Sequence, residues 1–412
     1  MNSLLQKGKN MKRVIILNRW DDELSEYHRY IDHTKNKVAY ITTKAGKFRL
    51  SPELAVVIDV LDQLVPGKEL EDALMRSKTA LDDRVDHILC LSEFDLLTGA
   101  WAREFLGVKG YGIEQVLRFR DKTAMKNAIL KSGLNAPNFV SAEDDGLLNA
   151  FVENISFPVI AKPKCGAASA GCAALRTKEE LFQFLEDKPR ADYEVEEFVD
   201  GPIYHVDGLV FKGEIFFVKA WRYIGTCLGF ASGSPLGSVM IESGSHNDQL
   251  TAFSEQCLRA LGHDNGCFHL ELIENHNGLY FLEIGARVGG GEIPFIIKDL
   301  FDIDFVHEWI RIELGMTPLL PPPKNGVIGG FLMIPEPKSA PVEVIERTSL
   351  IGRIPNLYHE ILPHVGSVLD GKGGYDKIAG RFHFCGSEEY ELEEAIAQAK
   401  KHYQLTFAPL PR

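Results

Sequence analysis

The sequence has no long apolar segment and no excess of basic residues. No apolar run in its 412 residues approaches the roughly 20 residues that a membrane-spanning helix requires. Residues 1–10 are polar and basic and lack the apolar core of a signal peptide. The formal net charge of −13 argues against a surface that binds nucleic acid. We therefore expect a protein that uses neither a membrane nor a nucleic acid as its partner.

Paired cysteine motifs are also absent. The seven cysteines are scattered along the chain, and no two of them form a C-x-x-C pair. An odd, unpatterned set of this kind is typical of reduced thiols in a cytosolic protein. The sequence also has no internal repeat and no low-complexity segment. We expect a cytoplasmic protein whose length allows two to four domains.

The first hundred residues alternate between strand-like and helical patterns. Strand-like runs lie at 13–18 (RVIILN), 37–42 (KVAYIT), 55–60 and 87–91 (HILCL). This alternation predicts a parallel α/β domain, in which ligands gather at the carboxyl ends of the strands. Glu93 follows the last of these runs and is therefore a candidate site residue. The alternative is a carboxylate that only stabilises the start of a helix through its dipole.

Two apolar runs that each carry one glutamate dominate the stretch from His269 to Gly291. They flank the turn Asn275-His276-Asn277-Gly278, and Asn-Gly between strand-like runs predicts a hairpin. Glu271 and Glu283 lie within these runs, where a carboxylate is costly unless it is paired or binds a metal. On adjacent antiparallel strands the two side chains can face one divalent cation. The alternative is a core hairpin with two salt-bridged glutamates.

Hydrogen-bond donors follow the second glutamate. Arg287 comes four residues after Glu283 and is followed by Gly289, Gly290 and Gly291. A guanidinium group beside backbone without side chains suits a phosphate or a carboxylate.

A second candidate anion site lies at 157–174 (FPVIAKPKCGAASAGCAA). Lys162 stands where a strand-like run ends, and the loop of small residues at 166–171 follows it. Lysine supplies a point charge, and small residues let backbone N–H groups approach a phosphate. No G-K-[ST] follows the glycines, so this is not a Walker A loop. The stretch at 193–201 (YEVEEFVDG) predicts either an ordinary edge strand or a strand that presents its backbone to a purine.

Three further stretches complete the pattern. Asp121 can cap a helix that ends near Gly133, and Lys122 in its first turn is unfavourable unless an anion is nearby. The density of glycine, serine and proline at 221–244 predicts a long loop, of the kind that forms lids or is disordered. Beyond the proline-rich linker that begins at Pro318, strand-like runs and a helix predict a C-terminal α+β extension.

Five stretches, taken in order, resemble the ATP-grasp superfamily. They are RDKTAMK (120–126), PVIAKP (158–163), VEEFVDG (195–201), HLEL (269–272) and FLEIGARVGGG (281–291). The ordered set is specific although no single stretch is, and the resemblance covers residues 80–310. Within the superfamily the chain is similar to ligases that join two L-amino acids, including arginine-preferring enzymes of bacterial antibiotic pathways. The resemblance implies an α/β ATP-grasp fold with a Rossmann-like domain at 1–119, a central subdomain at 120–199 and a C-terminal subdomain with its extension at 200–412.

The resemblance also implies an activity and a site. ATP would activate an amino-acid carboxylate as an acyl phosphate, with Mg²⁺ (or Mn²⁺) bound by Glu271 and Glu283. The implied phosphate contacts are Lys122, Lys162 and Ser169, and the implied adenine contacts are Glu196, Leu282 and the backbone of Glu197 and Val199. Arg287 would stabilise the transferring phosphoryl group. The first amino acid would meet Glu93, Arg287, Gly289, Gly290 and Gly291.

The sequence departs from the superfamily pattern in ways that bear on these implications. Gly285 replaces a frequent asparagine two residues after the second glutamate, which weakens one metal site or leaves a water in its place. Ile203 follows Gly201-Pro202, where an acid that contacts ribose often stands. Gly291 replaces a bulky residue of some relatives and leaves room for a larger substrate side chain. Asp376 lies in a glycine-rich loop and is either a solvated turn residue or an acid that selects a basic substrate such as arginine.

Two other functions remain open at this point. The chain could charge a carrier protein or another amine with an amino acid, or it could bind a nucleotide without ligase activity. The expected partners are small amino-acid substrates, and the sequence leaves a homodimer open.

Overall fold

The computed structural model describes residues 11–371 and 378–410. Within it the chain forms two compact units, which are described separately. Unit 1 contains the chain up to Leu117 together with Val306–Pro318, and unit 2 contains Arg118–Phe305 and the chain from Leu319 onward.

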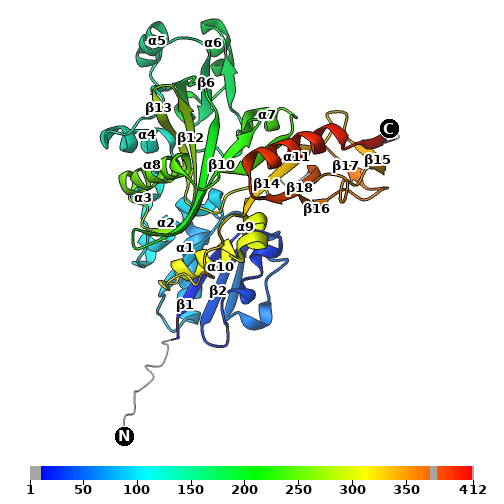
Figure 1. The fold of residues 1–412 in the computed structure, drawn as a ribbon. Coiled ribbons are helices and arrows are strands. Elements are labelled where there is room, and N and C mark those ends of the chain that lie inside the picture. Colours follow the sequence, from blue (N-terminus) through cyan, green and yellow to red (C-terminus); the bar gives the residue numbers. More distant parts are fainter. Residues whose placement is uncertain (1–10, 372–377, 411–412) are drawn as a thin grey trace. The chain divides into compact units, whose positions relative to one another are not determined.

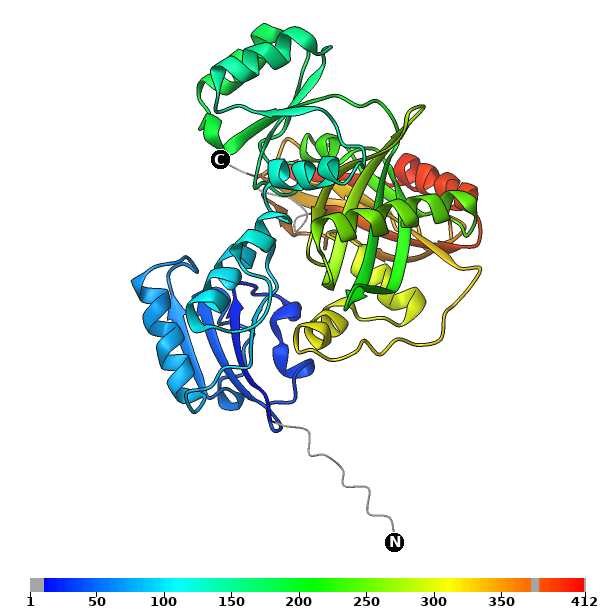
Figure 2. The ribbon, with the colours of Figure 1, turned by 90° about the vertical axis from the view of Figure 1, so that its left-hand side faces the viewer.

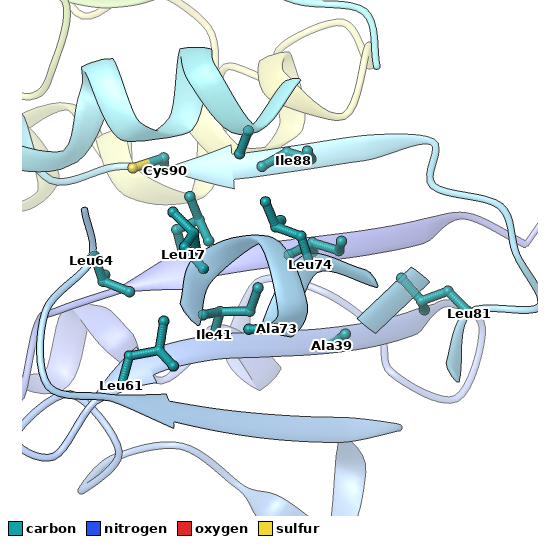
Figure 3. Packing of buried hydrophobic residues seen from close by; sticks show 13 residues of the cluster. Leu17, Ala39, Ile41, Leu61, Leu64, Ala73, Leu74, Leu81, Ile88 and Cys90 are labelled. Atoms are coloured by element: carbon teal, nitrogen blue, oxygen red, sulfur yellow. The ribbon is translucent and has the colours of Figure 1, made fainter. Parts of the chain in front are cut away.

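Unit 1 contains a parallel four-stranded sheet in the order β3-β2-β1-β4, which confirms the predicted parallel α/β arrangement. Its strands are β1 (Arg13–Asn18), β2 (Lys37–Thr43), β3 (Val57–Leu61) and β4 (His87–Cys90). Its helices include α1 (Lys68–Ala80), α2 (Leu96–Leu106), α3 (Ile113–Leu117), most of α10 (Phe305–Glu313) and the 3-10 turns η1 (Glu23–Ser25), η2 (Tyr27–Arg29), η3 (Pro52–Leu54) and η4 (Glu93–Asp95). In Figure 3, Ala73 and Leu74 of α1 pack over Leu17, Ile41 and Ile88 of the sheet. Burial of these apolar side chains fixes the helix on the sheet.

Unit 2 begins with α4 (Lys122–Lys131) and a small antiparallel sheet in the order β5-β8-β6-β7. The strands are β5 (Phe139–Ser141), β6 (Val159–Pro163), β7 (Ala173–Leu175) and β8 (Tyr193–Glu197), and η5 (Arg190–Asp192) precedes β8. Helices α5 (Asp145–Asn154) and α6 (Lys178–Glu186) cover one face of this sheet (Figure 2), where Leu148 and Leu181 join the core formed with Val195. Because β8 lies between β5 and β6, the edge-strand alternative for 193–201 is wrong, and the contact of its backbone with a purine stays a prediction.

The larger sheet of unit 2 has eight strands in the order β13-β12-β9-β10-β11-β14-β18-β16, all paired antiparallel. They are β9 (Ile203–Phe211), β10 (Glu214–Ile224), β11 (Leu236–Met240), β12 (Asn265–Asn275), β13 (Gly278–Gly285), β14 (Ile328–Pro335), β16 (Leu357–Ile361) and β18 (Ile378–Gly386). Asn275 pairs with Gly278, so the predicted Asn-Gly hairpin is confirmed. In Figure 1, β12 and β13 lie together beside α4 and α8 (Ser245–Leu261).

Two adjacent glycines face helices on opposite sides of the larger sheet, and Gly329 allows a close approach. A Cβ at Gly329 would lie 2.5 Å from Ile296 of α9 (Ile293–Phe301), whereas one at Gly330 would lie 3.5 Å from Ile396 of α11 (Glu389–His402). Successive strand residues point to opposite faces, so α9 and α11 cover opposite sides of β14. The predicted C-terminal extension therefore contributes strands to the same sheet that carries the glutamate hairpin.

The long loop expected at 221–244 is wrong. Most of this stretch forms the end of β10, the short helix α7 (Cys227–Ala231) and β11, and Trp221 pairs directly with Met240. Strand β11 also pairs with β14, so hydrogen bonds on both of its edges outweigh the local preference of glycine and serine for turns. Residues 225–235 and 241–244 lie outside the strands.

A third, smaller sheet completes unit 2. It contains β15 (Val342–Arg347), β17 (Val368–Leu369) and β19 (Leu405–Pro409) in the order β17-β15-β19. Among the helices of the described residues, none is long and apolar enough to cross a membrane.

Candidate active site

The two glutamates of the hairpin lie directly opposite each other. Glu271 of β12 pairs with Glu283 of β13, at a point where the register shifts by one residue. Directly opposed residues on antiparallel strands project to the same face, which brings the two carboxylates together. Glu271 is buried and accepts a hydrogen bond of 3.1 Å from the Tyr223 hydroxyl, and Glu283 is partly exposed.

The Lys122 ammonium group neutralises Glu283. Lys122 opens α4, whose start is capped by the Asp121 carboxylate, and its Nζ lies 2.9 Å from Glu283 Oε2 and donates to the Gly166 carbonyl at 3.1 Å. Burial alone would lower the pKa of Lys122, but the Glu283 carboxylate outweighs it and raises the pKa. Burial would raise the pKa of Glu283, but Lys122 and Lys162 lower it to about 2. The sequence pattern predicted an anion near Lys122, and the Glu283 carboxylate is such an anion.

A second buried charge cluster surrounds Lys162 at the end of β6. Its Nζ lies 2.6 Å from Glu196 and 3.8 Å from Glu194, both on β8. Lys126, one turn after Lys122 on α4, donates to Glu194 Oε1 at 2.5 Å and also to Glu196. Burial alone would lower the pKa of Lys162, but the nearby glutamates outweigh this effect and raise it. Two lysines and two glutamates therefore balance one another in a nearly dry environment.

The small-residue loop after β6 is tied to the start of α4. The Lys122 backbone N–H donates to the Lys164 carbonyl, and the Arg120 guanidinium donates to the Cys165 carbonyl at 2.8 Å. Ser169 has a φ of 55°, in the left-handed region that turns the chain sharply. The predicted phosphate loop is thus held beside Lys122.

The side chains expected near adenine have partners of their own. The Glu197 carboxylate accepts from the Asn138 backbone N–H at 2.9 Å and from its side-chain amide at 3.0 Å. Val199 is partly buried just after β8, and Leu282 is partly buried at the bulge of β13. Glu196 is engaged by Lys126 and Lys162, so its nearest partners are cations.

A row of buried polar side chains extends from Glu271 across the large sheet. His205 on β9 pairs with Glu271, and Asp207 pairs with His269 on β12. Asp207 accepts from His205 Nδ1 at 2.6 Å and from His269 Nδ1 at 2.8 Å, and His269 Nε2 lies 3.5 Å from Glu271 Oε1. Burial lowers the pKa of His269, but Asp207 outweighs it and raises the pKa to about 9.

Arg287 and the glycine run follow β13 on the way to α9. Arg287 is half-buried, and its Nη1 donates to the Val288 carbonyl at 2.8 Å. Its positive charge acts to lower the pKa of His269. Gly289 is buried against Asp207 and His269, whereas Gly290 is exposed.

Two predicted substrate residues lie outside the described part of unit 2. Glu93 is in unit 1, where it begins η4 directly after the parallel sheet, so its contact with a substrate stays a prediction. Asp376 lies outside the described residues. Ile203 is the first residue of β9 and leaves the ribose contacts a prediction as well.

Sequence reasoning did not identify Lys126 or the polar row. Lys126 lies in the stretch that carries the family resemblance, but it reads as an ordinary surface lysine of a helix. The sequence does contain a pattern that could have revealed the row. His205 and Asp207 are two residues apart on one otherwise apolar strand, and His269 and Glu271 are two apart on another, so each pair faces one side of the sheet.

The donor set fits a hard divalent cation. Glu271 and Glu283 offer carboxylate oxygens from facing strands, and oxygen ligands are those that Mg²⁺ and Mn²⁺ prefer. Glu283 is ionised at neutral pH, as a ligand must be. The Lys122 ammonium group pairs with one of these two carboxylates, that of Glu283.

No protein-family model matches the chain. The L-arginine-specific L-amino acid ligase of Bacillus subtilis is 28% identical over 341 residues, which cover 78% of this chain and 80% of that protein. The alanine–anticapsin ligase of Bacillus subtilis strain 168 is 26% identical over 278 residues, covering 60% and 57%.

The solved structures show the fold. The L-amino acid ligase from Bacillus licheniformis superposes with a TM-score of 0.75 at 18% identity and covers 97% of this chain and 100% of that one. The biotin carboxylase domain of the Hydrogenobacter thermophilus 2-oxoglutarate carboxylase, solved with MgADP, gives a TM-score of 0.65 at 14% identity and covers 96% and 91%.

Proposed function

We propose that this protein, which has the ATP-grasp fold, is an ATP-dependent ligase that joins two L-amino acids into a dipeptide and forms ADP and phosphate. The α/β ATP-grasp fold implied by the sequence resemblance is confirmed by the sheets described above and by the likeness to the Bacillus licheniformis ligase. The relatives named as amino acid ligases support the reaction class.

One observation carries the proposal. Lys122, Glu283 and Glu271 converge from α4, β13 and β12, and the predicted phosphate loop is tied to Lys122 through the Gly166 carbonyl. A cation, two carboxylates and a backbone loop of small residues are what a metal–triphosphate complex requires. When bound by Glu271 and Glu283, Mg²⁺ would withdraw charge from the transferred phosphoryl group.

The proposed reaction proceeds in two steps, formation of an acyl phosphate and attack on it by an amine. A carboxylate oxygen of the first amino acid attacks the γ-phosphorus of ATP, the bond from that phosphorus to the β–γ bridging oxygen breaks, and an acyl phosphate and ADP form. The amine of the second amino acid then attacks the carbonyl carbon. The carbon–oxygen bond to phosphate breaks, the amine loses a proton, and the dipeptide and phosphate leave. Activation is necessary because an unactivated carboxylate would have to expel oxide.

The residues of the chain divide this work between them. In the proposal Lys122, Lys162 and the loop around Ser169 hold the phosphates that are not transferred, and Glu271 and Glu283 bind the cation. Arg287 stabilises the negative charge that develops on the transferring phosphoryl group and on the acyl phosphate. Adenine would meet Leu282, Glu196 and the backbone of Glu197 and Val199.

The first substrate is proposed to be arginine or another basic amino acid. Its carboxylate would lie against Arg287 and the glycine run, and Glu93 would accept from its ammonium group. Asp376 would pair with the basic side chain, which could contribute on the order of 1–3 kcal/mol, roughly ten- to a hundredfold in kcat/KM. The supporting observation is the relative named for arginine specificity.

The test measures ATP-dependent phosphate release with pairs of free amino acids, and mass spectrometry identifies the product. Dipeptide formation with two free amino acids supports the proposal. Turnover only when an acyl carrier is supplied would indicate the carrier-charging alternative, and ATP binding without turnover would indicate a nucleotide-binding protein. An Asp376→Ala variant whose preference for arginine over a neutral amino acid equals that of the parent would contradict the role of Asp376.

A further inference from the structure

A buried row of hydrogen bonds and one ion pair leads to Glu271 from the interior of the large sheet. Ser238 lies 2.8 Å from His205 Nε2, His205 Nδ1 donates to Asp207 at 2.6 Å, and His269 Nδ1 donates to the second Asp207 oxygen at 2.8 Å. The remaining nitrogen of His269, Nε2, lies 3.5 Å from Glu271 Oε1. The chain thus ends on one of the two glutamates assigned to the cation.

Stability alone does not account for this chain. Ser238, His205 and Asp207 are fully buried, and His269 is nearly so. Taking charged and polar groups out of water costs free energy, and well-packed apolar residues often stabilise a core as well as a buried ion pair does. What such a chain adds is a fixed orientation, because each side chain is held at both ends.

Three residues of the row, His205, Asp207 and His269, place nitrogen and oxygen atoms within 4.8 Å of one another. Such a cluster could also hold a metal ion. Both ring nitrogens that face Asp207, however, lie at hydrogen-bond distance from separate carboxylate oxygens. Protons therefore account for these contacts without a metal. The geometry is that of an oriented histidine whose outer nitrogen faces a ligand position.

The glycine run rests on the same pair of residues. A Cβ built at Gly289 would lie 2.3 Å from Asp207 Oδ1 and 3.2 Å from His269 Nδ1. The carboxylate would have to move, since the first distance is far below any normal contact. At Gly290 an added Cβ meets nothing within 4 Å. The close approach is therefore specific to Gly289.

We propose that Asp207 and His269 form one positioning unit that sets both the Glu271 carboxylate and the backbone of the glycine run. Asp207 orients His269, His269 holds Glu271, and Gly289 packs on both. The unit therefore fixes the cation relative to the backbone that would receive the carboxylate of the first amino acid. The inference rests on the proposed function only for the identity of the two ligands, namely the cation at Glu271 and the substrate carboxylate at the glycine run.

The test uses Mn²⁺ as the probe, because it takes oxygen ligands as Mg²⁺ does and its binding can be followed by electron paramagnetic resonance. Mn²⁺ is titrated into the full-length protein with ADP present, and ADP binding is measured separately without metal. We expect Asp207→Asn and His269→Gln to weaken Mn²⁺ binding by about 10- to 100-fold, the usual effect of removing a residue that orients a ligand. Binding of metal-free ADP should stay within about twofold of the parent, since neither side chain touches the lysines at the predicted phosphate positions.

Gly289→Ala provides a second variant that leaves every side chain of the row in place. It should weaken Mn²⁺ binding by displacing Asp207, whereas Gly290→Ala should leave the Mn²⁺ affinity unchanged. His263→Gln is the control for loss of a buried imidazole, because its Nε2 donates to the Cys267 carbonyl away from the row. Should Asp207→Asn fail to fold, Gly289→Ala still decides the question.

Unchanged Mn²⁺ affinity in folded Asp207→Asn, or in Gly289→Ala, would overturn the proposal. Stoichiometric zinc in the purified parent that is lost in Asp207→Asn would also overturn it, because the row would then be a metal site. The readout does not need turnover. A parent that binds Mn²⁺ and ADP but makes no dipeptide would contradict the proposed function and leave the positioning unit intact.

Discussion

Lys122 Nζ lies 2.9 Å from Glu283 Oε2, so a lysine at a predicted phosphate position is paired with a glutamate at a predicted cation position. The two charges compensate each other, with the Lys122 side chain buried and the Glu283 side chain partly exposed. In the proposed site, a metal–nucleotide complex would replace both partners. The metal cation would take the place of the lysine beside Glu283, and a phosphate would take the place of the glutamate beside Lys122. We therefore predict that binding of ATP and binding of the metal depend on each other.

Replacement of Glu283 by alanine should abolish turnover and preserve the fold. The change removes an oxygen from the proposed cation site and also leaves the Lys122 ammonium group without its carboxylate partner. We expect ATP-dependent phosphate release to fall at least about 100-fold, as is usual when a group that binds a catalytic metal or stabilises charge is lost. Glu274→Ala on the same hairpin is the control. Near-normal ATP hydrolysis with Mg²⁺ in Glu283→Ala would contradict the assignment.

Replacement of Lys126 by methionine should destabilise the protein. Lys126 is fully buried between Glu194 and Glu196, and its loss leaves two carboxylates with only the Lys162 ammonium group. Removing one member of a buried charge cluster costs about 3–5 kcal/mol. Urea denaturation of the parent and of Lys126→Met measures the loss.

Lys131→Met, at the exposed end of the same helix, controls for the change of side chain. The double variant Lys126→Met/Glu194→Gln should recover part of the lost free energy, because it removes one unpaired carboxylate. A loss below about 1 kcal/mol in Lys126→Met would show that water reaches the cluster and screens it.

Limited proteolysis should respond to ligands at 225–235 and not elsewhere. This segment joins β10 to β11 and contains α7, and Cys227 lies 3.9 Å from Glu271, so a ligand at the glutamates would order it. We expect chymotrypsin to cleave near Phe230 more slowly when ATP, Mg²⁺ and an amino acid are present. Cleavage at Phe48, an exposed residue of unit 1, is the internal control. Equal rates at Phe230 in both states would show that the segment is not a lid.

His263 should make the protein sensitive to acid. Its ring is buried, its Nε2 donates to the Cys267 carbonyl at 2.9 Å, and burial lowers its pKa from 6.5 to about 4. Between these values the unfolded chain binds a proton that the folded protein does not. Stability is therefore fully present above pH 6.5 and is lost as the pH falls toward 4, by about 3 kcal/mol for this group.

The measurement is the free energy of unfolding of the parent and of His263→Gln at several values between pH 7 and pH 4. Glutamine can still donate to the Cys267 carbonyl but does not titrate in this range. The variant should lose less stability than the parent as the pH falls. Parallel curves would show that His263 is accessible to water in the folded protein.

Local patterns in the sequence determined the hairpin and the helix that bring the predicted phosphate and cation residues together. The Asn-Gly turn fixes the register of β12 and β13 as far as Leu272 and Phe281, and the one-residue shift that follows sets Glu271 opposite Glu283. The Asp121 cap fixes the start of α4 and hence the place of Lys122. These features depend on residues close together in the chain, so their periodicity and turn chemistry were sufficient.

Only the tertiary structure decided which distant charges become partners. Lys126 meets Glu194 and Glu196 across 68 and 70 residues, and Asp207 meets His269 across 62. The stretch at 221–244 forms the end of β10, α7 and β11, because β11 makes backbone hydrogen bonds to a strand on each side. The amino-acid composition of the stretch does not reveal these hydrogen bonds. Long-range pairing depends on which strands lie side by side and on how deeply they are buried, and neither is a property of a local sequence window.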